Sequence, residues 1–207
     1  RLCDSLALLD SPPRVLVSAS AIGYYGDRGD EKLNELAAPG VGFLSDVCRE
    51  WEQAVAPARE SGVRVVNLRI GIVMSPRGGA LAQMLTPFKL GLGGVLGTGN
   101  QYMSWIAPDD VVGIILHALT DSSIEGPVNA VSPNPVTNRT FAKTLGAVLS
   151  RPTILPTPTF GIRLLFGEMA DALLLSGQRV VPRVLESSGF KFKYPDLEGA
   201  LRHVLGR

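Results

Sequence analysis

The sequence predicts an α/β fold, in which helices flank a parallel sheet and a smaller α+β lobe lies beside it. Two apolar strands, residues 14–18 and 63–73, flank a helix predicted over residues 41–60, and a strand–helix–strand unit of this length makes its strands parallel. A third apolar run, residues 126–131, predicts another parallel strand. The glycine-rich composition of residues 75–100 indicates that a different lobe begins there.

The first elements follow from apolar spacing and from proline. Residues 1–9 carry apolar side chains at helical spacing, and Pro12 and Pro13 end that pattern. The strand over 14–18 ends in a small, polar run from Ser18 to Gly26, and open parallel sheets bind their ligands beyond the carboxyl ends of strands. The helix over 41–60 has one apolar stripe, formed by Phe43, Val47, Trp51 and Val55.

The middle of the chain contains shorter elements. In order, they are a helix over 80–90, a strand over 101–106, and helices over 111–119 and 139–149. Asp109 and Asp110 are expected to cap the helix over 111–119, and Thr137 and Asn138 the helix over 139–149, because their side chains accept hydrogen bonds from free amides.

The chain changes character again at Arg151, where prolines favour an extended backbone. The elements predicted beyond it are an apolar helix over 160–175, a short helix over 182–188, a half-buried strand over 190–194 and a last helix over 197–205. We therefore divide the chain into residues 1–75 with 108–150, which form the sheet, and residues 76–107 with 151–207, which form the smaller lobe.

Composition bounds the class of protein. Hydrophobic residues make up 45% of the 207 residues, which is enough for a packed core and excludes disorder. Lys and Arg number 20 against 19 Asp and Glu, so a net charge of +1 gives no electrostatic reason to bind nucleic acid or an anionic membrane. Cys3 and Cys48 form neither a disulfide framework nor a metal motif, so we expect free thiols in a cytoplasmic protein and no metal site.

Two segments are candidates for chemistry. The sequence contains no Gly-x-Ser-x-Gly turn around its early serines and no phosphate-binding Gly-x₄-Gly-Lys-Ser/Thr loop, so neither a hydrolase elbow nor a phosphate-loop nucleotidase is supported. What remains is the run from Ser18 to Gly26 at a strand end and the glycine-rich run from Gly97 to Asp110.

Together and in this order, these segments resemble the extended short-chain dehydrogenase/reductase family, the branch that includes nucleotide-sugar epimerases. The matching runs are Ser18 to Gly26, Leu68 to Val73, Gly97 to Asp110 and Gly126 to Asn129. The runs Pro87 to Gly94 and Gly177 to Pro182 are similar to one subfamily, known as epimerase-like proteins and historically as cell-division inhibitors. The resemblance implies the C-terminal part of a Rossmann-type parallel sheet, a substrate lobe, and a C-terminal domain of unknown function.

The resemblance further implies a nicotinamide cofactor, NADP by similarity, with NAD as the alternative. The family's glycine-rich phosphate turn has no counterpart after Arg1, and we expect it to precede Arg1 in a longer protein. The residues implied on the nicotinamide side are Ser18, Cys48, Arg69, Gly71 and Val73.

This sequence departs from the family's catalytic pattern at one point. Ser20 matches the serine that polarises the substrate oxygen in the family. The family's Tyr–Lys pair is missing, and its positions hold Leu44 and Cys48. Tyr24 and Tyr25 could replace the acid, although a phenol with a pKa near 10 needs a cationic helper, so packing under the cofactor is the alternative.

The residues implied on the substrate side are Gly97, Gly99, Gln101 and Trp105. Amides of this loop could meet a diphosphate, but Ser104 lies where some family members carry a phosphate-binding Arg, and Ala107 replaces the subfamily's usual His. We therefore expect a nucleotide-sugar-like or other small carbonyl or hydroxyl substrate.

Two functions follow from these patterns. The first is an NADP(H)-dependent epimerase or oxidoreductase whose acid–base chemistry is weakened by the missing pair. The second is a non-catalytic dinucleotide-binding protein with a regulatory or scaffold role. The patterns indicate a small-molecule partner and carry no signal for an oligomeric state.

Overall fold

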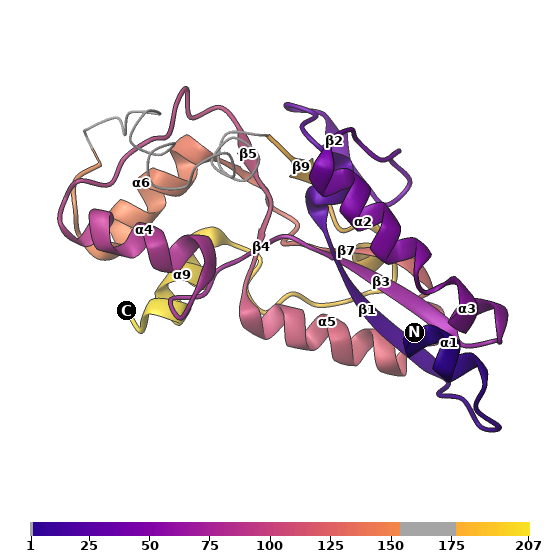
Figure 1. The fold of residues 1–207 in the computed structure, drawn as a ribbon. Helices are drawn as coiled ribbons and strands as arrows, with labels where there is room; N and C mark the ends of the chain where they lie inside the picture. Colours follow the sequence, from indigo (N-terminus) through magenta and orange to yellow (C-terminus); the bar gives the residue numbers. More distant parts are fainter. Residues whose placement is uncertain (1, 154–176) are drawn as a thin grey trace.

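A computed structural model describes residues 2–153 and 177–207, and its centre is a parallel sheet of three strands (Figure 1). Strands β1 (Val15–Ala21), β3 (Arg64–Ile70) and β7 (Gly126–Ala130) lie in the order β1-β3-β7. Both strand pairs are parallel, with Val17 opposite Val66 and Leu68 opposite Val128. The predicted α/β class with a parallel sheet is confirmed.

Helices cover both faces of this sheet. Helices α1 (Leu2–Ala7) and α3 (Ala56–Glu60) pack with Val65 of β3 on one face. Helix α5 (Pro108–Thr120) covers the other face, where its Ile114 is fully buried with Val66 and Leu68. Successive side chains of β3 therefore enter different cores, as the two-residue period of a strand requires.

The helix predicted over 41–60 is in fact two helices. Helix α2 (Phe43–Gln53) ends before Pro57, which lies in the first turn of α3. Proline has no N–H to donate to the carbonyl of Gln53 and its ring would clash there, so one continuous helix cannot form.

The strand predicted over 63–73 is also interrupted, at Gly71. Beyond it, β4 (Ile72–Val73) leaves the central sheet and pairs in parallel with β6 (Trp105–Ile106). A side chain at Gly71 would place its Cβ 2.7 Å from the carbonyl oxygen of Ser104, so glycine is what allows this close approach. The strand predicted over 101–106 is split likewise, because β5 (Tyr102–Met103) pairs instead with β8 (Val136–Thr137).

A second core lies among α4 (Gly79–Lys89), α6 (Asn138–Leu149) and α9 (Leu197–Leu205). Figure 1 shows these three helices on one side of the molecule and the central sheet on the other, with β4 between them. The predicted cap of α6 is confirmed for Thr137, whose side chain accepts a hydrogen bond from the Thr140 amide, but not for Asn138, which is the first residue of the helix. Helix α6 packs in this second core, although the predicted division assigned it to the part with the sheet.

The strand predicted over 190–194 was wrong, because its amides bond to a carboxylate instead of to a neighbouring strand. Asp110, which is 2% exposed, accepts hydrogen bonds from the amides of Lys193 at 2.7 Å and Tyr194 at 3.1 Å. The expected capping role of Asp109 and Asp110 was also wrong, because α5 already begins at Pro108 and both residues lie in its first turn.

Several short elements complete the fold. The 3₁₀ helix η1 (Ile22–Tyr25) follows β1 directly, and β2 (Lys32–Leu33) pairs in parallel with β9 (Arg179–Val180). Helix α8 (Arg183–Ser187) agrees with its prediction, and the helix predicted over 160–175 lies outside the described residues. No helix within 2–153 and 177–207 has the length and apolar character needed to cross a membrane.

We expect Asp110→Ala to lower the free energy of unfolding by about 2 kcal/mol, because it leaves two amides without their acceptor. Val112→Ala is the matched control on the same helix, since Val112 is 57% exposed, and it should change stability by no more than about 0.5 kcal/mol. Urea unfolding of both variants measures the difference. Equal stabilities would show that the Asp110 contact does not hold the C-terminal segment.

Candidate functional site

A cavity of about 1250 Å³ lies where β1 and β3 end, between the central sheet and helices α4 and α6. The sheet side of its lining comes from the ends of these strands, from η1 and from β4: Ala21, Ile22, Gly23, Ile70, Gly71, Ile72 and Val73. Helix α2 adds Leu44, Val47, Cys48 and Trp51. The carboxyl ends of parallel strands are where open α/β sheets bind ligands, so this cavity is the candidate site.

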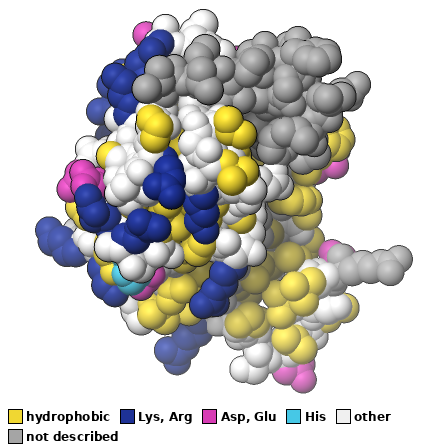
Figure 2. Space-filling view, turned by 90° about the vertical axis from the view of Figure 1, so that its left-hand side faces the viewer, with side chains coloured by type: hydrophobic (Ala, Val, Ile, Leu, Met, Phe, Trp, Pro, Cys, Tyr) yellow, Lys and Arg dark blue, Asp and Glu magenta, His cyan; other side chains and the backbone are white. Residues whose placement is uncertain are grey.

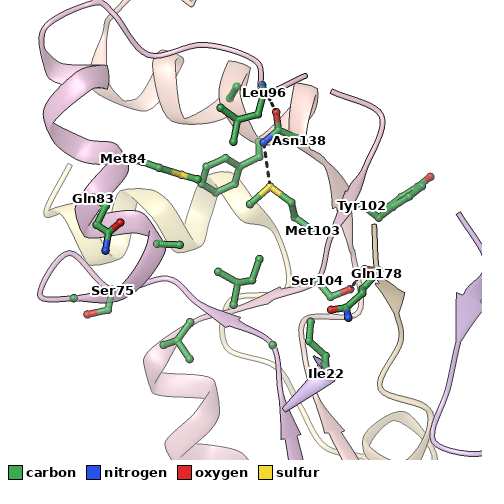
Figure 3. Close-up of a pocket in the computed structure, with 18 of the residues that line it drawn as sticks. Ile22, Ser75, Gln83, Met84, Leu96, Tyr102, Met103, Ser104, Asn138 and Gln178 are labelled. Carbon is green, nitrogen blue, oxygen red and sulfur yellow. Dashed lines mark hydrogen bonds between the residues drawn. The ribbon is translucent and has the colours of Figure 1, made fainter. Parts of the chain in front are cut away.

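The opposite wall is apolar and comes from the second core. Its residues include Met84 and Phe88 of α4, Phe141 and Ala142 of α6, Leu96 and Met103. The buried Asn138 shapes this wall, because its side-chain oxygen accepts from the Leu96 amide at 2.8 Å and its nitrogen donates to the Met103 sulfur at 3.5 Å (Figure 3). The loop before β5 is thereby fixed against α6.

Ser104 and Gln178 form a polar end of the cavity beside Ile22 (Figure 3). The Ser104 hydroxyl donates to the Gln178 carbonyl oxygen at 2.7 Å and accepts from the Val180 amide at 2.8 Å. The Gln178 side chain donates from Nε2 to the carbonyl oxygen of Gly26 at 2.9 Å. A carboxamide can make further hydrogen bonds, so Gln178 can also meet a ligand.

Next to the cavity, under α2, lies a buried ion pair. Arg69 is 3% exposed and donates from Nε and Nη2 to the two oxygens of Glu52, each at 2.8 Å. Ser20, opposite Arg69 in the sheet, donates its hydroxyl proton to Glu52 Oε1 at 2.8 Å. In this arrangement the proton of Ser20 is committed to Glu52 rather than directed into the cavity.

The two candidate tyrosines lie in the same network. Tyr25 has no exposed surface, and its hydroxyl donates to Asn129 Oδ1 at 2.7 Å and accepts from Arg69 Nη1 at 2.9 Å. Burial raises the pKa of Tyr25, which opposes loss of its proton. Tyr24 lies under the guanidinium of Arg69, whose Cζ is 3.4 Å from the ring centroid. Neither ring lines the cavity. Both tyrosines instead pack against Arg69.

The structure brings together three of the residues predicted on the cofactor side. Cys48, Gly71 and Val73 line the cavity, whereas Ser18 and Arg69 do not. Cys48 is 4% exposed, and burial raises the pKa of its thiol. Within the described residues, no group of three His, Cys, Asp or Glu side chains is arranged to hold a metal ion.

The four residues predicted on the substrate side are not in the cavity lining. Trp105 is fully buried in the second core and donates from Nε1 to the Asn134 carbonyl oxygen at 3.0 Å. Gln101 donates to the carbonyl oxygen of Leu96 at 3.1 Å. Gly97 and Gly99 have positive φ angles of 56° and 74°, and they serve to turn the loop that precedes β5.

Sequence reasoning missed the residues that form the far wall and the polar end. Met84, Phe141 and Asn138 follow an ordinary helical pattern, and nothing local distinguishes them from core residues. Gln178 belongs to the run from Gly177 to Pro182 on which the subfamily resemblance rests, so that run was the available signal. Its contact with Ser104 joins residues 74 positions apart, and no local pattern encodes such a contact.

Two family models and several known proteins match this chain. Residues 2–130 match the model of the NAD-dependent epimerase/dehydratase family, and residues 157–204 match a domain of unknown function, DUF1731. An epimerase family protein of Mycobacterium bovis is 44% identical over 203 residues, which cover 98% of this chain and 67% of the relative. The chain thus spans about two thirds of that relative's length.

Two solved structures share the fold closely. The human epimerase family protein SDR39U1, solved with NADPH, matches with a TM-score of 0.91 and 34% identity over 100% of this chain and 70% of its own. A nucleoside-diphosphate sugar epimerase from Corynebacterium glutamicum matches with a TM-score of 0.82 and 40% identity over 99% of this chain and 40% of its own.

We expect Glu52→Gln to destabilise the fold by about 3 kcal/mol, because breaking a buried ion pair leaves one charge without its partner. Ser20→Ala removes a single hydrogen bond from the same carboxylate and should cost about 1 kcal/mol. The control is Arg49→Gln, which breaks an exposed ion pair with Asp46 on the same helix and should cost at most about 0.5 kcal/mol. Urea unfolding gives all three values, and a cost for Glu52→Gln as small as that of the control would contradict the importance of the buried pair.

Proposed function

The chain belongs to the NAD-dependent epimerase/dehydratase family, and on that premise we propose that it binds NADP(H) and acts on a small carbonyl or hydroxyl compound in the cavity beside β1 and β3. The observation that carries this proposal is the position of the cavity, at the carboxyl ends of two parallel strands. The NADPH bound to the human relative supports NADP over NAD.

The residues at the sheet end suit a nicotinamide ring. Ile22, Ile70 and Val73 give the cavity an apolar surface there, on which a flat heteroaromatic ring can pack. At the start of α4, a Cβ added to Gly78 or Gly79 would meet nothing within 4 Å, so this part of the lining also leaves room for a ligand. When bound, the cofactor supplies the hydride acceptor or donor.

The chain's own contribution to proton transfer is weak under this proposal. By family resemblance, Leu44 and Cys48 occupy the positions of the missing Tyr–Lys pair, and both line the cavity. Leucine has no proton to exchange, and a neutral thiol has no positive charge to lower the pKa of a neighbouring acid. Ser20 gives its proton to Glu52, so it acts on the substrate only if that hydrogen bond is exchanged. We therefore expect slow turnover.

We expect bound NADPH to protect Cys48 from alkylation. Cys48 lines the proposed cofactor region, so a bound nicotinamide should slow its reaction with iodoacetamide at least tenfold. The raised pKa of this thiol leaves little thiolate at neutral pH, so the reaction is run at pH 8.5 and followed by mass spectrometry of the Cys48 peptide of the full-length protein. Cys3, buried against α3 and outside the cavity, is the internal control. Equal rates at Cys48 with and without saturating NADPH would place the nicotinamide elsewhere.

We expect the double variant Leu44→Tyr with Cys48→Lys to turn over faster than the natural full-length protein. General acid–base assistance is worth about 10²–10⁴ in rate, so a gain of roughly 100-fold is the expected result. The matched control is Leu44→Phe with Cys48→Met, which adds similar volume without a protonatable group. The measurement is NADPH oxidation with a carbonyl substrate or NADP⁺ reduction with an alcohol.

Two results would change the proposal. If the natural protein already runs at ordinary reductase rates, the missing pair is not a limitation and the proton comes from another group. If neither form turns over any compound while NADPH binds tightly, the protein is a non-catalytic dinucleotide-binding protein.

A further inference from the structure

Among the described residues that line the cavity, none is an Asp, Glu, Lys, Arg or His. The basic side chains of the neighbouring helices lie outside instead, since Lys89, Arg139 and Lys143 are all exposed. Figure 2 views the molecule from the side of these helices and shows Lys and Arg side chains gathered on this outer face. The positive charge of this lobe is therefore directed to solvent.

An uncharged, apolar cavity is a poor site for a diphosphate. A phosphate group that leaves water needs charged or aligned donors to replace its hydration, and proteins usually supply Arg, Lys or a helix N-terminus. Two helix starts lie in the described lining, that of α4 at Gly78 and Gly79 and that of α6 at Asn138. The first amides of α6 already donate to Gln101, Gly99 and Thr137, so only the start of α4 is available, and no basic side chain of the described lining supports it. That one helix end could meet a single phosphate at the edge of the cavity but would leave the apolar interior unused.

The interior has the features of a site for a hydrocarbon body. Met84 and Leu96 lie across the cavity from Ser104 and Gln178, and Met103 lies between the two sides (Figure 3). Thioether side chains are flexible and polarisable, so they adapt to irregular apolar ligands. The cavity volume of about 1250 Å³ exceeds the 300–1,000 Å³ of typical small-molecule sites, which leaves space for a ligand beside the nicotinamide.

A polar pair with fixed geometry lies at the other end, whereas the polar lining residues on the α4 side, Gln83 and Thr86, are exposed to solvent. Ser104 is fixed by hydrogen bonds to Gln178 and Val180, and the side chain of Gln178 is held by Gly26. Both residues lie beside Ile22, where β1 ends and where the proposed nicotinamide region begins. A substrate with a single polar group would direct it to this end and its apolar body to α4 and α6.

We propose that this cavity takes an uncharged ketone or alcohol with a large apolar body, and not a nucleoside-diphosphate sugar. This inference rests on the proposed NADP(H)-dependent function, because only that function makes the ligand a substrate. The preference of the cavity for an apolar ligand can be measured without turnover. Gln178 orients the reacting oxygen, and Met84, Met103 and Phe141 contact the body.

The test uses the full-length protein saturated with NADPH and the uncharged fluorescent dye Nile red as a probe of the cavity. Competition with 2-decanone should displace the dye, while UDP-glucose at the same concentration should not. Met84→Asp places a charge on the apolar wall and should weaken dye binding at least tenfold, whereas Met84→Leu should stay within twofold of the natural protein. The matched control is Val112→Asp on α5, which is 57% exposed, lies outside the lining and should leave dye binding unchanged.

The outcomes separate the two proposals. Displacement by UDP-glucose at lower concentration than by 2-decanone, or equal dye binding by Met84→Asp and the natural protein, overturns the apolar substrate class. NADPH binding is measured independently by its own fluorescence. Absence of NADPH binding, together with dye displacement by 2-decanone, overturns the proposed cofactor-dependent function and supports the apolar character of the cavity.

Discussion

The buried ion pair between Arg69 and Glu52 is the constraint on which the site depends. It joins the carboxyl end of β3 to α2, and through Ser20 and Tyr25 it also reaches β1, η1 and β7. Taking a guanidinium and a carboxylate out of water is costly. That cost is offset here by the two hydrogen bonds between them and by those from Ser20 to Glu52 and from Arg69 to Tyr25. Because these hydrogen bonds need all their partners in place, they hold the ends of β1 and β3 in one geometry. In that geometry, Ile22 and Gly23 of η1 line the cavity.

The two environments at the end of the sheet are kept apart by the backbone of η1. On one side, Ser20 and Arg69 both donate to Glu52, and Arg69 also donates to the hydroxyl of Tyr25. On the other side, the cavity is lined by apolar groups and by a few neutral polar ones. The charged side chains near the sheet end are thus held in a network that stabilises the fold, while none of the described lining residues is an Asp, Glu, Lys, Arg or His.

The central elements could be predicted because their signals are local. Apolar runs with strand periodicity gave β1, β3 and β7, and their parallel pairing followed from the helices between them. What could not be predicted depends on distant partners. Gly71 interrupts a strand because Ser104 approaches it, and the amides of Lys193 and Tyr194 avoid a strand because Asp110 accepts their hydrogen bonds. At the site, Cys48, Gly71 and Val73, which were predicted from the resemblance, do line the cavity. The burial of Trp105 and the hydrogen bond from Ser20 to Glu52 arise from tertiary packing alone.

The short pair of strands β4 and β6 has a consequence for how the cavity can open. Ile72 and Trp105, opposite each other in the pair, pack into the core of α4 and α6, whereas Val73 and Ile106 pack into the core of the central sheet. Hydrogen bonds from the Ile72 amide to Ser104 and from the Met74 amide to Ile106 lock the two strands together. The two halves share this ribbon, so they cannot slide apart along it without breaking those bonds. A widening of the cavity that keeps these bonds is therefore a rotation about the β4–β6 ribbon and not a sliding movement along it.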